Sequence, residues 1–201
     1  LQAAHRLLRA VHPNPPKAPQ VHMPIATLPP ALTRIVRSHF RLDWKGIHGA
    51  AHWARVMRHG LYVARHHGGD PLVIRLFALL HDSQRINEGR DPGHGARAAA
   101  FAVELNRDGV LGLNPSQLDW LRQACEEHSD GKTHAAPTVQ ACWDADRLDL
   151  GRVGAYPNPR FLCTDAAMDQ DYIVFAYRWS QRDPKACRQS TFQNTPLNRA
   201  T

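Results

Sequence analysis

The sequence predicts a single all-α domain. Apolar residues recur at spacings of three and four along most of the chain, which is the periodicity of helices that bury one face. We find no convincing run of alternating apolar and polar residues that would predict a strand, and no internal repeat. The chain has 201 residues, of which 43% are hydrophobic, so it is long enough to build one sizeable core.

Two helices are expected in the first third of the domain. The first begins near Pro30 and covers the segment ALTRIVRSHF. The second covers residues 47–67, where small and apolar residues at helical spacing predict one buried stripe. That predicted stripe consists of Ile47, Ala50, Ala51, Ala54, Met57, Leu61 and Ala64.

The third helix has the clearest start signal. Two glycines at 68–69 end the preceding helix, and Asp70 followed by Pro71 is typical of an N-cap and a first helical position. The apolar run PLVIRLFALL then leads to the doublet at residues 81–82. Residues 83–93 are polar and contain glycine and proline, which predicts a loop.

The later helices are marked mainly by their caps. Asn114 and Pro115 are expected to open one helix, and Thr138 is a candidate cap for another. Residues 129–137 are expected to form a loop between them. The remaining predicted helices cover residues 94–109, 115–128, 138–154 and, with weaker signals, 164–179.

The composition divides the chain into a domain and two tails. Residues 1–30 are rich in proline and are expected to be extended or disordered, residues 31–178 form the domain, and residues 179–201 form a polar, basic tail. The chain begins with Leu1, so we expect a fragment or a chain with an upstream extension, with Met23 as a candidate natural start.

The positive charge lies mostly in these tails. The formal net charge is +7, of which residues 1–22 and 179–201 contribute +3 each. The middle of the chain is therefore almost neutral, which disfavours nucleic acid as the main partner. No apolar stretch approaches the roughly 20 residues that span a bilayer, so no membrane association is expected.

The cysteines give no sign of a zinc ribbon or of a redox motif. They are far apart and form no C-x-x-C pair, which favours reduced thiols and a cytoplasmic location. The four residues are Cys125, Cys142, Cys163 and Cys187.

The most informative feature is the doublet His81-Asp82 at the end of the third helix. With His52 upstream and Asp146 downstream, each on its own helix, it predicts four ligands for one metal ion in a helical core. Two imidazoles and two carboxylates suit Mn, Fe, Co, Ni or Zn better than Ca or Mg. We therefore expect one divalent transition metal as the cofactor.

The same residues carry a resemblance to a known family. The segments HWARV at 52–56, LLHD at 79–82 and DADRLDLGRVG at 144–154, with HGARAA at 94–99, resemble the small stand-alone bacterial members of the HD-domain superfamily of metal-dependent phosphohydrolases. The resemblance covers roughly residues 32–156. It implies a core of five or six helices and hydrolysis of a phosphate ester or anhydride. The metal ligands that it implies are His52, His81, Asp82 and Asp146.

Several neighbouring residues compete for related roles. Asp144 lies two positions before Asp146, and the resemblance favours Asp146 as the ligand. His48 lies one turn before His52 and is a candidate pocket wall or phosphate donor. We favour one tightly bound ion, with His94 and His128 contacting either the phosphate or a weaker second ion.

The expected reaction follows from the metal. A bound ion lowers the pKa of water and polarises a phosphoryl oxygen, and Asp82 would orient or deprotonate that water. Arg85, Arg90 and Lys132 on the neighbouring loops could neutralise phosphate charge, and Glu88 could accept a hydrogen bond from a ribose or a base. The expected substrate is a nucleotide or a similar small phosphate.

Three other functions fit parts of the sequence. The chain could be a non-catalytic, metal-stabilised module that senses a nucleotide. It could be a di-iron oxygenase built on the same scaffold, as in proteins similar to myo-inositol oxygenase, which would need both His94 and His128 as ligands. It could also bind nucleic acid through its tails. The sequence does not predict an oligomeric state.

Overall fold

The computed structural model describes residues 28–181, and the prediction of an all-α fold is confirmed there. These residues form eight α-helices and two short 3₁₀ helices, and none of them lies in a strand. The elements are α1 (Pro30–His39), α2 (Ala50–His67), α3 (Pro71–Leu80), α4 (His94–Arg107), α5 (Pro115–Glu127), α6 (Pro137–Leu148), η1 (Leu150–Val153), η2 (Pro159–Phe161), α7 (Asp165–Met168) and α8 (Gln170–Ser180).

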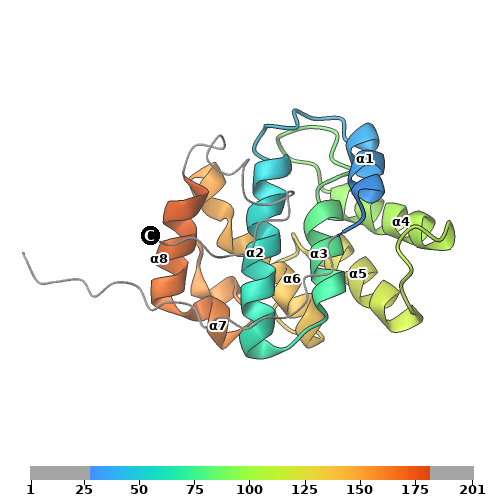
Figure 1. Ribbon diagram of the computed structural model, residues 1–201. Helices are drawn as coiled ribbons and strands as arrows, with labels where there is room; N and C mark the ends of the chain where they lie inside the picture. Colours follow the sequence, from blue (N-terminus) through green and yellow to red (C-terminus); the bar gives the residue numbers. More distant parts are fainter. Residues whose placement is uncertain (1–27, 182–201) are drawn as a thin grey trace, which may run out of the picture.

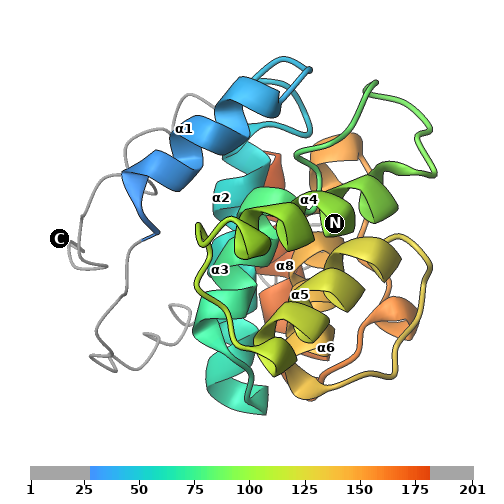
Figure 2. The same cartoon turned by 90° about the vertical axis from the view of Figure 1, so that its right-hand side faces the viewer.

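Helix α2 organises the rest of the domain. It packs against α3 on one side and against α6 behind, and α7 and α8 also contact it (Figure 1). Helices α4 and α5 pack on each other, and α5 rests on α3 and α6 (Figure 2). This arrangement brings the C-terminal ends of α3 and α5 and the start of α4 close to the first turn of α2.

The predicted helix starts at Asp70 and Asn114 are confirmed. The Asp70 carboxylate accepts hydrogen bonds from the backbone N–H groups of Leu72 and Val73, and Pro71 is the first helical residue. Asn114 accepts from the N–H of Gln117, whose side chain bonds back to the Asn114 backbone. Such caps satisfy N–H groups that a helix leaves unpaired at its first turn, which is why they are readable in the sequence.

Other boundaries differ from the prediction. The segment 138–154 is not one helix, because α6 ends at Leu148 and η1 follows it. Thr138 is not a cap, since the N-cap residue is Ala136 and the Thr138 hydroxyl accepts the backbone N–H of Asp70. The segment 164–179 is also divided, because Asp169 caps a new helix by accepting the N–H of Tyr172.

The buried face of α2 is wider than the predicted stripe and is turned relative to it. Of the seven stripe residues only Ala54 is fully buried, and Ile47 precedes the helix and is exposed. The buried face carries instead His52, Trp53, Val56, His59, Gly60 and Val63. The reason is that helices on several sides cover α2, so polar side chains of this helix also lie inside the molecule.

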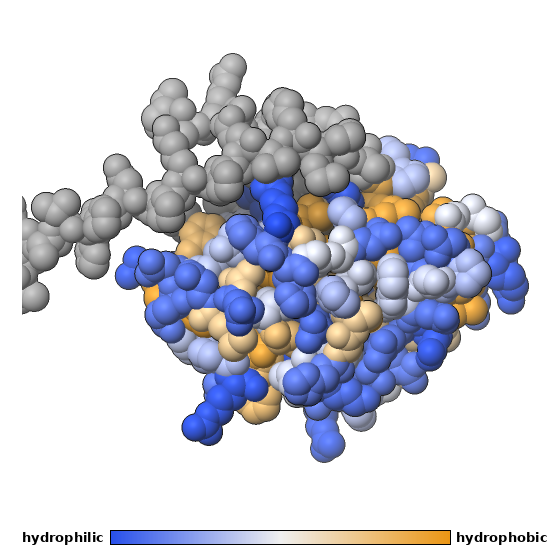
Figure 3. All heavy atoms as spheres, turned by 90° about the horizontal axis from the view of Figure 1, so that it is seen from below, coloured by the Kyte–Doolittle hydropathy of each residue, from blue (hydrophilic) through white to orange (hydrophobic). Residues whose placement is uncertain are grey.

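The core lies between α2, α3, α5 and α6. All residues from Val73 to Leu80 on α3 are buried, together with Trp53 and Trp143. Hydrophilic residues cover most of the face shown in Figure 3, with smaller hydrophobic areas between them. Burial of this apolar surface is the main favourable contribution to folding.

The predicted tails are largely outside the described residues. The extended or disordered character expected for residues 1–30 and 179–201 falls mostly on residues 1–27 and 182–201, which the structure does not describe. The domain limits at residues 31 and 178 stay predictions.

None of the helices between residues 28 and 181 combines the length and the apolar character needed to cross a membrane.

Candidate metal centre

Three helices bring two histidines and two aspartates together in the core. His52 extends from the first half of α2, and His81 caps the C-terminus of α3; their Nε2 atoms lie 3.0 Å apart. Asp82 Oδ2 lies 3.5 and 3.6 Å from these two nitrogens, and Asp146 Oδ1 lies 3.4 and 3.8 Å from them. We call these four residues, which are the ligands expected from the sequence, the first subsite.

A second pair of histidines faces the other oxygen of Asp82. His94 begins α4 and His128 caps the C-terminus of α5, and their Nε2 atoms lie 2.8 Å apart. Asp82 Oδ1 lies 3.4 Å from His94 Nε2 and 3.8 Å from His128 Nε2. These two histidines and Asp82 form the second subsite, so one carboxylate is shared by both subsites.

The hydrogen bonds at Nδ1 define the protonation of all four imidazoles. In each ring Nδ1 faces an oxygen that can only accept, so Nδ1 carries a proton, and in the neutral ring Nε2 carries the lone pair. The bonds run from His52 to Asp149 Oδ2 (2.7 Å), from His81 to Phe77 O (3.1 Å), from His94 to Asp91 O, and from His128 to Cys125 O (2.7 Å).

The cluster therefore consists of acceptors that face one another. In each subsite two Nε2 lone pairs converge, and Asp146 Oδ1 is buried without a hydrogen-bond partner in the described residues. A buried acceptor without a donor is costly, and a cation removes that cost. Two ligands at ~2.0–2.2 Å from one ion are about 2.8–3.6 Å apart at octahedral or tetrahedral angles, close to the observed spacing. The donor set thus fits divalent metal.

The pKa values keep most of these groups in their metal-binding form. Burial lowers the pKa of His81 to about 3, so this ring stays neutral. Burial opposes ionisation of Asp82, but the surrounding imidazoles of His81, His128 and His52 outweigh burial and hold its pKa well below the usual range. Arg152, with the nearby histidines, similarly outweighs burial and lowers the pKa of Asp146. Both carboxylates are anions at neutral pH.

His128 is the exception among the imidazoles. Burial lowers its pKa, but the hydrogen bond to Asp82 and the charges of Asp146 and Asp82 outweigh burial and raise it. Protonated His128 can therefore stabilise the second subsite when no cation is bound there. Metal binding there has to displace this proton, so it strengthens as the pH rises.

A buried ion pair orients His52, and the sequence analysis did not identify it. Asp149 accepts the Nδ1 proton of His52 and two hydrogen bonds from Arg55, at 2.5 and 2.9 Å. Asp149 is 0% exposed, and its pKa is lowered because His52 and Arg55 outweigh the effect of burial. The available signal was spacing: Arg55 lies three residues after His52, as Asp149 does after Asp146.

Two arginines lie beside the two carboxylates of the cluster. Arg85 approaches Asp82 Oδ1 at 3.4 Å from the turn after α3, and Arg152 approaches Asp146 Oδ1 at 3.6 Å from η1. Both side chains are nearly buried, with 9% and 8% exposure. Arg85 was expected near the site from the sequence, whereas Arg152 was not identified.

His48 and Glu88 form a pair at the edge of this region. His48 Nδ1 lies 2.5 Å from Glu88 Oε2, and the Glu88 side chain is 40% exposed. Burial lowers the pKa of His48, which also responds to the charges of Asp82, Arg85 and Arg152. Among the contacts of residues 28–181, none joins His48 to a ligand atom of either subsite.

Lys132 is not brought to the cluster. Its ammonium pairs with Glu127 at 2.8 Å and approaches Asp130 at 3.9 Å, and the side chain is half exposed. The contacts found in residues 28–181 include none between Lys132 and either subsite. Lys132 was placed near phosphate because it follows His128 closely in sequence, but the loop turns it to the surface.

Asp144 has a different role from Asp146. Its carboxylate accepts the backbone N–H groups of Cys163 and Thr164 and the Thr164 hydroxyl, at 2.7 to 3.0 Å. Residues two apart on a helix point in different directions, so only Asp146 reaches the histidines. Asp144 therefore fixes the segment before α7 to α6.

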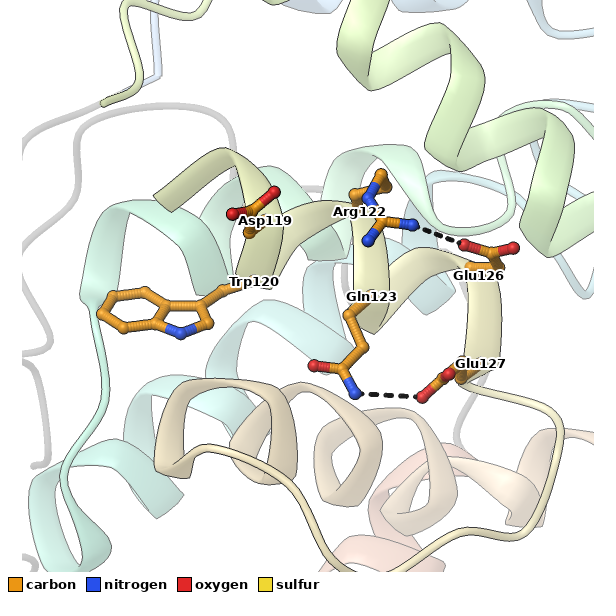
Figure 4. A pocket seen from close by; sticks show the side chains of 6 residues that line it. All are labelled: Asp119, Trp120, Arg122, Gln123, Glu126 and Glu127. Atoms are coloured by element: carbon orange, nitrogen blue, oxygen red, sulfur yellow. Dashed lines mark hydrogen bonds and ion pairs between the residues drawn. The ribbon is translucent and has the colours of Figure 1, made fainter. Parts of the chain in front are cut away.

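A separate hollow of about 510 Å³ lies on the outer surface of α5 (Figure 4). Its polar side chains are paired with each other: Arg122 with Glu126 and Gln123 with Glu127. All of its lining residues belong to this one helix, and none is a ligand of either subsite. This hollow therefore contributes no side chain to the buried His/Asp cluster.

No family model, no curated protein and no solved structure matches this chain. The cluster itself is the feature from which a function can be argued: an all-α fold encloses His52, His81, Asp82, His94 and His128, which could hold metal.

Proposed function

We propose that this chain is a metal-dependent phosphohydrolase of the HD type that uses two divalent transition-metal ions. One observation carries the proposal: two imidazole pairs, each with its Nε2 lone pairs converging, share the two oxygens of Asp82. A bridging carboxylate with nitrogen ligands on both sides is typical of two-metal hydrolytic sites. The motifs at 52–56, 79–82 and 144–154 support the same family.

The proposal extends the expectation from the sequence, which favoured a single tight ion. His94 and His128 were expected to contact phosphate, or a weaker second ion. Their Nε2 atoms lie 2.8 Å apart and close to Asp82 Oδ1, which favours the second ion. Mn, Fe, Co, Ni and Zn all accept this nitrogen and carboxylate set.

The residues of the cluster have different roles in the proposed reaction. Ions bound there would lower the pKa of an attacking water and neutralise charge on the phosphoryl group. Asp82, with its pKa held low, is the anion that both ions would share, and Asp149 fixes the ring of His52. The near-complete burial of His52, His81 and Asp82 keeps bulk water away from the reacting atoms.

The test is metal-dependent turnover of a panel of phosphate compounds. The full chain is freed of metal with a chelator, reloaded with Mn, Co or Ni, and assayed with nucleotides and with p-nitrophenyl phosphates. We expect turnover only after reloading, and a loss of about a hundredfold or more in Asp82→Asn. Asp108→Asn, which changes an exposed ion pair with Arg107, should match the wild type.

If Asp82→Asn fails to fold, His128→Gln provides the same comparison from the second subsite. Metal-loaded protein that binds a nucleotide by calorimetry but releases no product over hours would replace the hydrolase by a sensing module. No turnover and no nucleotide binding with metal bound would contradict both.

A di-iron oxygenase is the second candidate. Such an enzyme requires both His94 and His128 as ligands beside the first subsite, and the grouping of these two histidines with Asp82 supports it. The metal content of the protein as isolated distinguishes the two. Two irons per chain, with oxygen consumption and no phosphate release, would favour the oxygenase.

A further inference from the structure

The charged groups around the cluster indicate which class of substrate it would accept. On the basis of the proposed function, we infer that Arg85 and Arg152 form a phosphate clamp and that the chain acts on phosphomonoesters rather than on phosphodiesters. The two arginines come from the turns that follow the two carboxylate ligands in sequence. Arg85 therefore lies beside the second subsite, where it contacts Asp82 Oδ1. Arg152 lies beside the first subsite, where it contacts Asp146.

Each guanidinium is held in place by backbone carbonyls. Arg85 donates from Nη2 to Gly89 O at 2.6 Å and from Nε to Asn87 O at 3.4 Å. Arg152 donates from Nε to Ile47 O at 3.1 Å and from Nη1 to Asp149 O at 3.2 Å. These bonds orient both side chains before any ligand arrives, so little further entropy is lost on binding.

Each of the two guanidinium groups has further N–H groups that make no short hydrogen bond within residues 28–181. The contacts of Arg85 with Asp82 and of Arg152 with Asp146, at 3.4 and 3.6 Å, are longer than the 2.7–2.9 Å of a strong charged hydrogen bond. A phosphate oxygen between the subsites is a better acceptor than either carboxylate at this distance. Arg152 bonds to Ile47, next to His48, and Arg85 bonds to the residues on either side of Glu88, which pairs with His48, so both arginines border one region.

The number of oxygens favours one class of ester. A phosphoryl group that reaches both subsites turns two non-ester oxygens toward them, and a third non-ester oxygen would give the arginines an acceptor that no ion shares. A phosphodiester has only two non-ester oxygens, whereas a phosphomonoester has three. The site as a whole is therefore matched to a terminal phosphate.

The balance of charge around the cluster also favours a phosphomonoester. Asp82 and Asp146 are offset by Arg85 and Arg152, and Asp149 is offset by Arg55. Glu88, which is paired with His48 and 40% exposed, then remains against the charge of the ions that the site would bind. Such a surplus of positive charge favours a dianion over the monoanion of a diester.

The reaction is a simple hydrolysis. A P–O bond forms to the oxygen of water and the ester P–O bond breaks. One proton of the water ends on the alcohol that leaves and the other on the phosphate, so the products are an alcohol and hydrogen phosphate.

The experiment compares binding of a dianion and a monoanion. Inorganic phosphate and dimethyl phosphate are titrated by calorimetry at pH 8 into the full chain loaded with manganese. We expect phosphate to bind at least tenfold more tightly, and Arg152→Gln to weaken phosphate binding by about ten- to a hundredfold. Arg107→Gln, at an exposed position, should leave it unchanged.

Turnover gives an independent comparison that needs no variant. With p-nitrophenyl phosphate and bis(p-nitrophenyl) phosphate as substrates, kcat/KM should be higher for the monoester. Equal binding of dimethyl phosphate and phosphate, or faster turnover of the diester, would overturn the inference and leave the hydrolase intact. Protein that holds manganese but hydrolyses neither ester contradicts the hydrolase, while the calorimetry still decides the preference for dianions.

Discussion

At the scale of the residue, the second nitrogen of each histidine decides what the first can do. Backbone carbonyls accept the Nδ1 proton of His81, His94 and His128, and the Asp149 carboxylate accepts that of His52. A proton placed there leaves Nε2 free as a ligand and fixes the plane of the ring. The capacity of the cluster to hold metal therefore depends on atoms outside it.

Replacing Asp149 tests this dependence. In Asp149→Asn the buried Arg55 loses its counterion, so we expect a loss of about 3–5 kcal/mol in the free energy of unfolding. The ring of His52 loses its charged partner as well, and the affinity of the first subsite for metal should fall about ten- to a hundredfold. Urea unfolding and a competitive metal titration measure the two effects.

The matched control is Asp108→Asn, because Asp108 forms an exposed pair with Arg107. Surface pairs contribute little, so this variant should unfold like the wild type. An unchanged metal affinity in Asp149→Asn would show that His52 does not need this partner.

Residue identity was partly predictable. The sequence indicated His52, His81, Asp82 and Asp146 because each carries a ligand atom on or beside an apolar segment, and the structure brings all four together. It did not indicate Arg152, whose position depends on the carbonyls of Ile47 and Asp149. Contacts with distant backbone leave no pattern in the local sequence.

At the scale of the element, the second subsite depends on how closely α4 approaches α5. A Cβ atom at Gly95 would lie 2.6 Å from Cys125 O and 2.7 Å from Glu126 O. Those atoms are backbone and cannot turn aside. Since His94 precedes this glycine and His128 follows Glu126 closely, the close crossing is what brings the two imidazoles together.

Gly95→Ala should therefore act on metal content as well as on stability. The helix gains about 1 kcal/mol in propensity, but forcing α4 away from α5 costs about 1–3 kcal/mol. We expect a net loss of stability, and a fall from two bound ions per chain to one. Elemental analysis after dialysis against manganese, together with urea unfolding, measures both.

Gly93→Ala is the control, because a Cβ there would meet the end of the Arg97 side chain rather than backbone. This variant should keep both ions. Two ions retained in Gly95→Ala would mean that the second subsite tolerates a wider helix crossing.

The existence of most elements was predictable, whereas some of their ends were not. Asp70 and Asn114 are local signals, since an N-cap bonds to groups two or three residues away. The division of residues 138–154 after Leu148 has no comparable signal in the chain. Tertiary contacts decided it, because η1 and α8 pack against each other there.

At the scale of the whole molecule, burial of titratable groups makes stability depend on pH. His59 is fully buried on α2, and burial lowers its pKa to about 4 from the ordinary 6.5. The unfolded chain therefore takes up this proton first as the pH falls. Neutral His59 contributes its full stabilisation above pH 6.5, and this contribution is lost as the pH falls toward 4.

The free energy of unfolding should thus fall by about 2 kcal/mol between pH 7 and pH 5 because of His59 alone. In His59→Asn, measured by urea unfolding in the presence of a chelator, the decline should be shallower by that amount. His66→Asn, at an exposed position of the same helix, should keep the wild-type decline. Equal slopes in all three proteins would contradict the assignment.

The sequence by itself determined the all-α class, the starts of several helices and the ligand types that suit a transition metal. These properties depend on neighbours within one or two turns, so the chain carries them locally. Only the tertiary structure decided that Asp82 faces two histidine pairs, that Asp149 and Arg55 support His52, and that Lys132 points away. Distances between helices depend on how closely their surfaces pack, and spacing along the chain does not encode such packing.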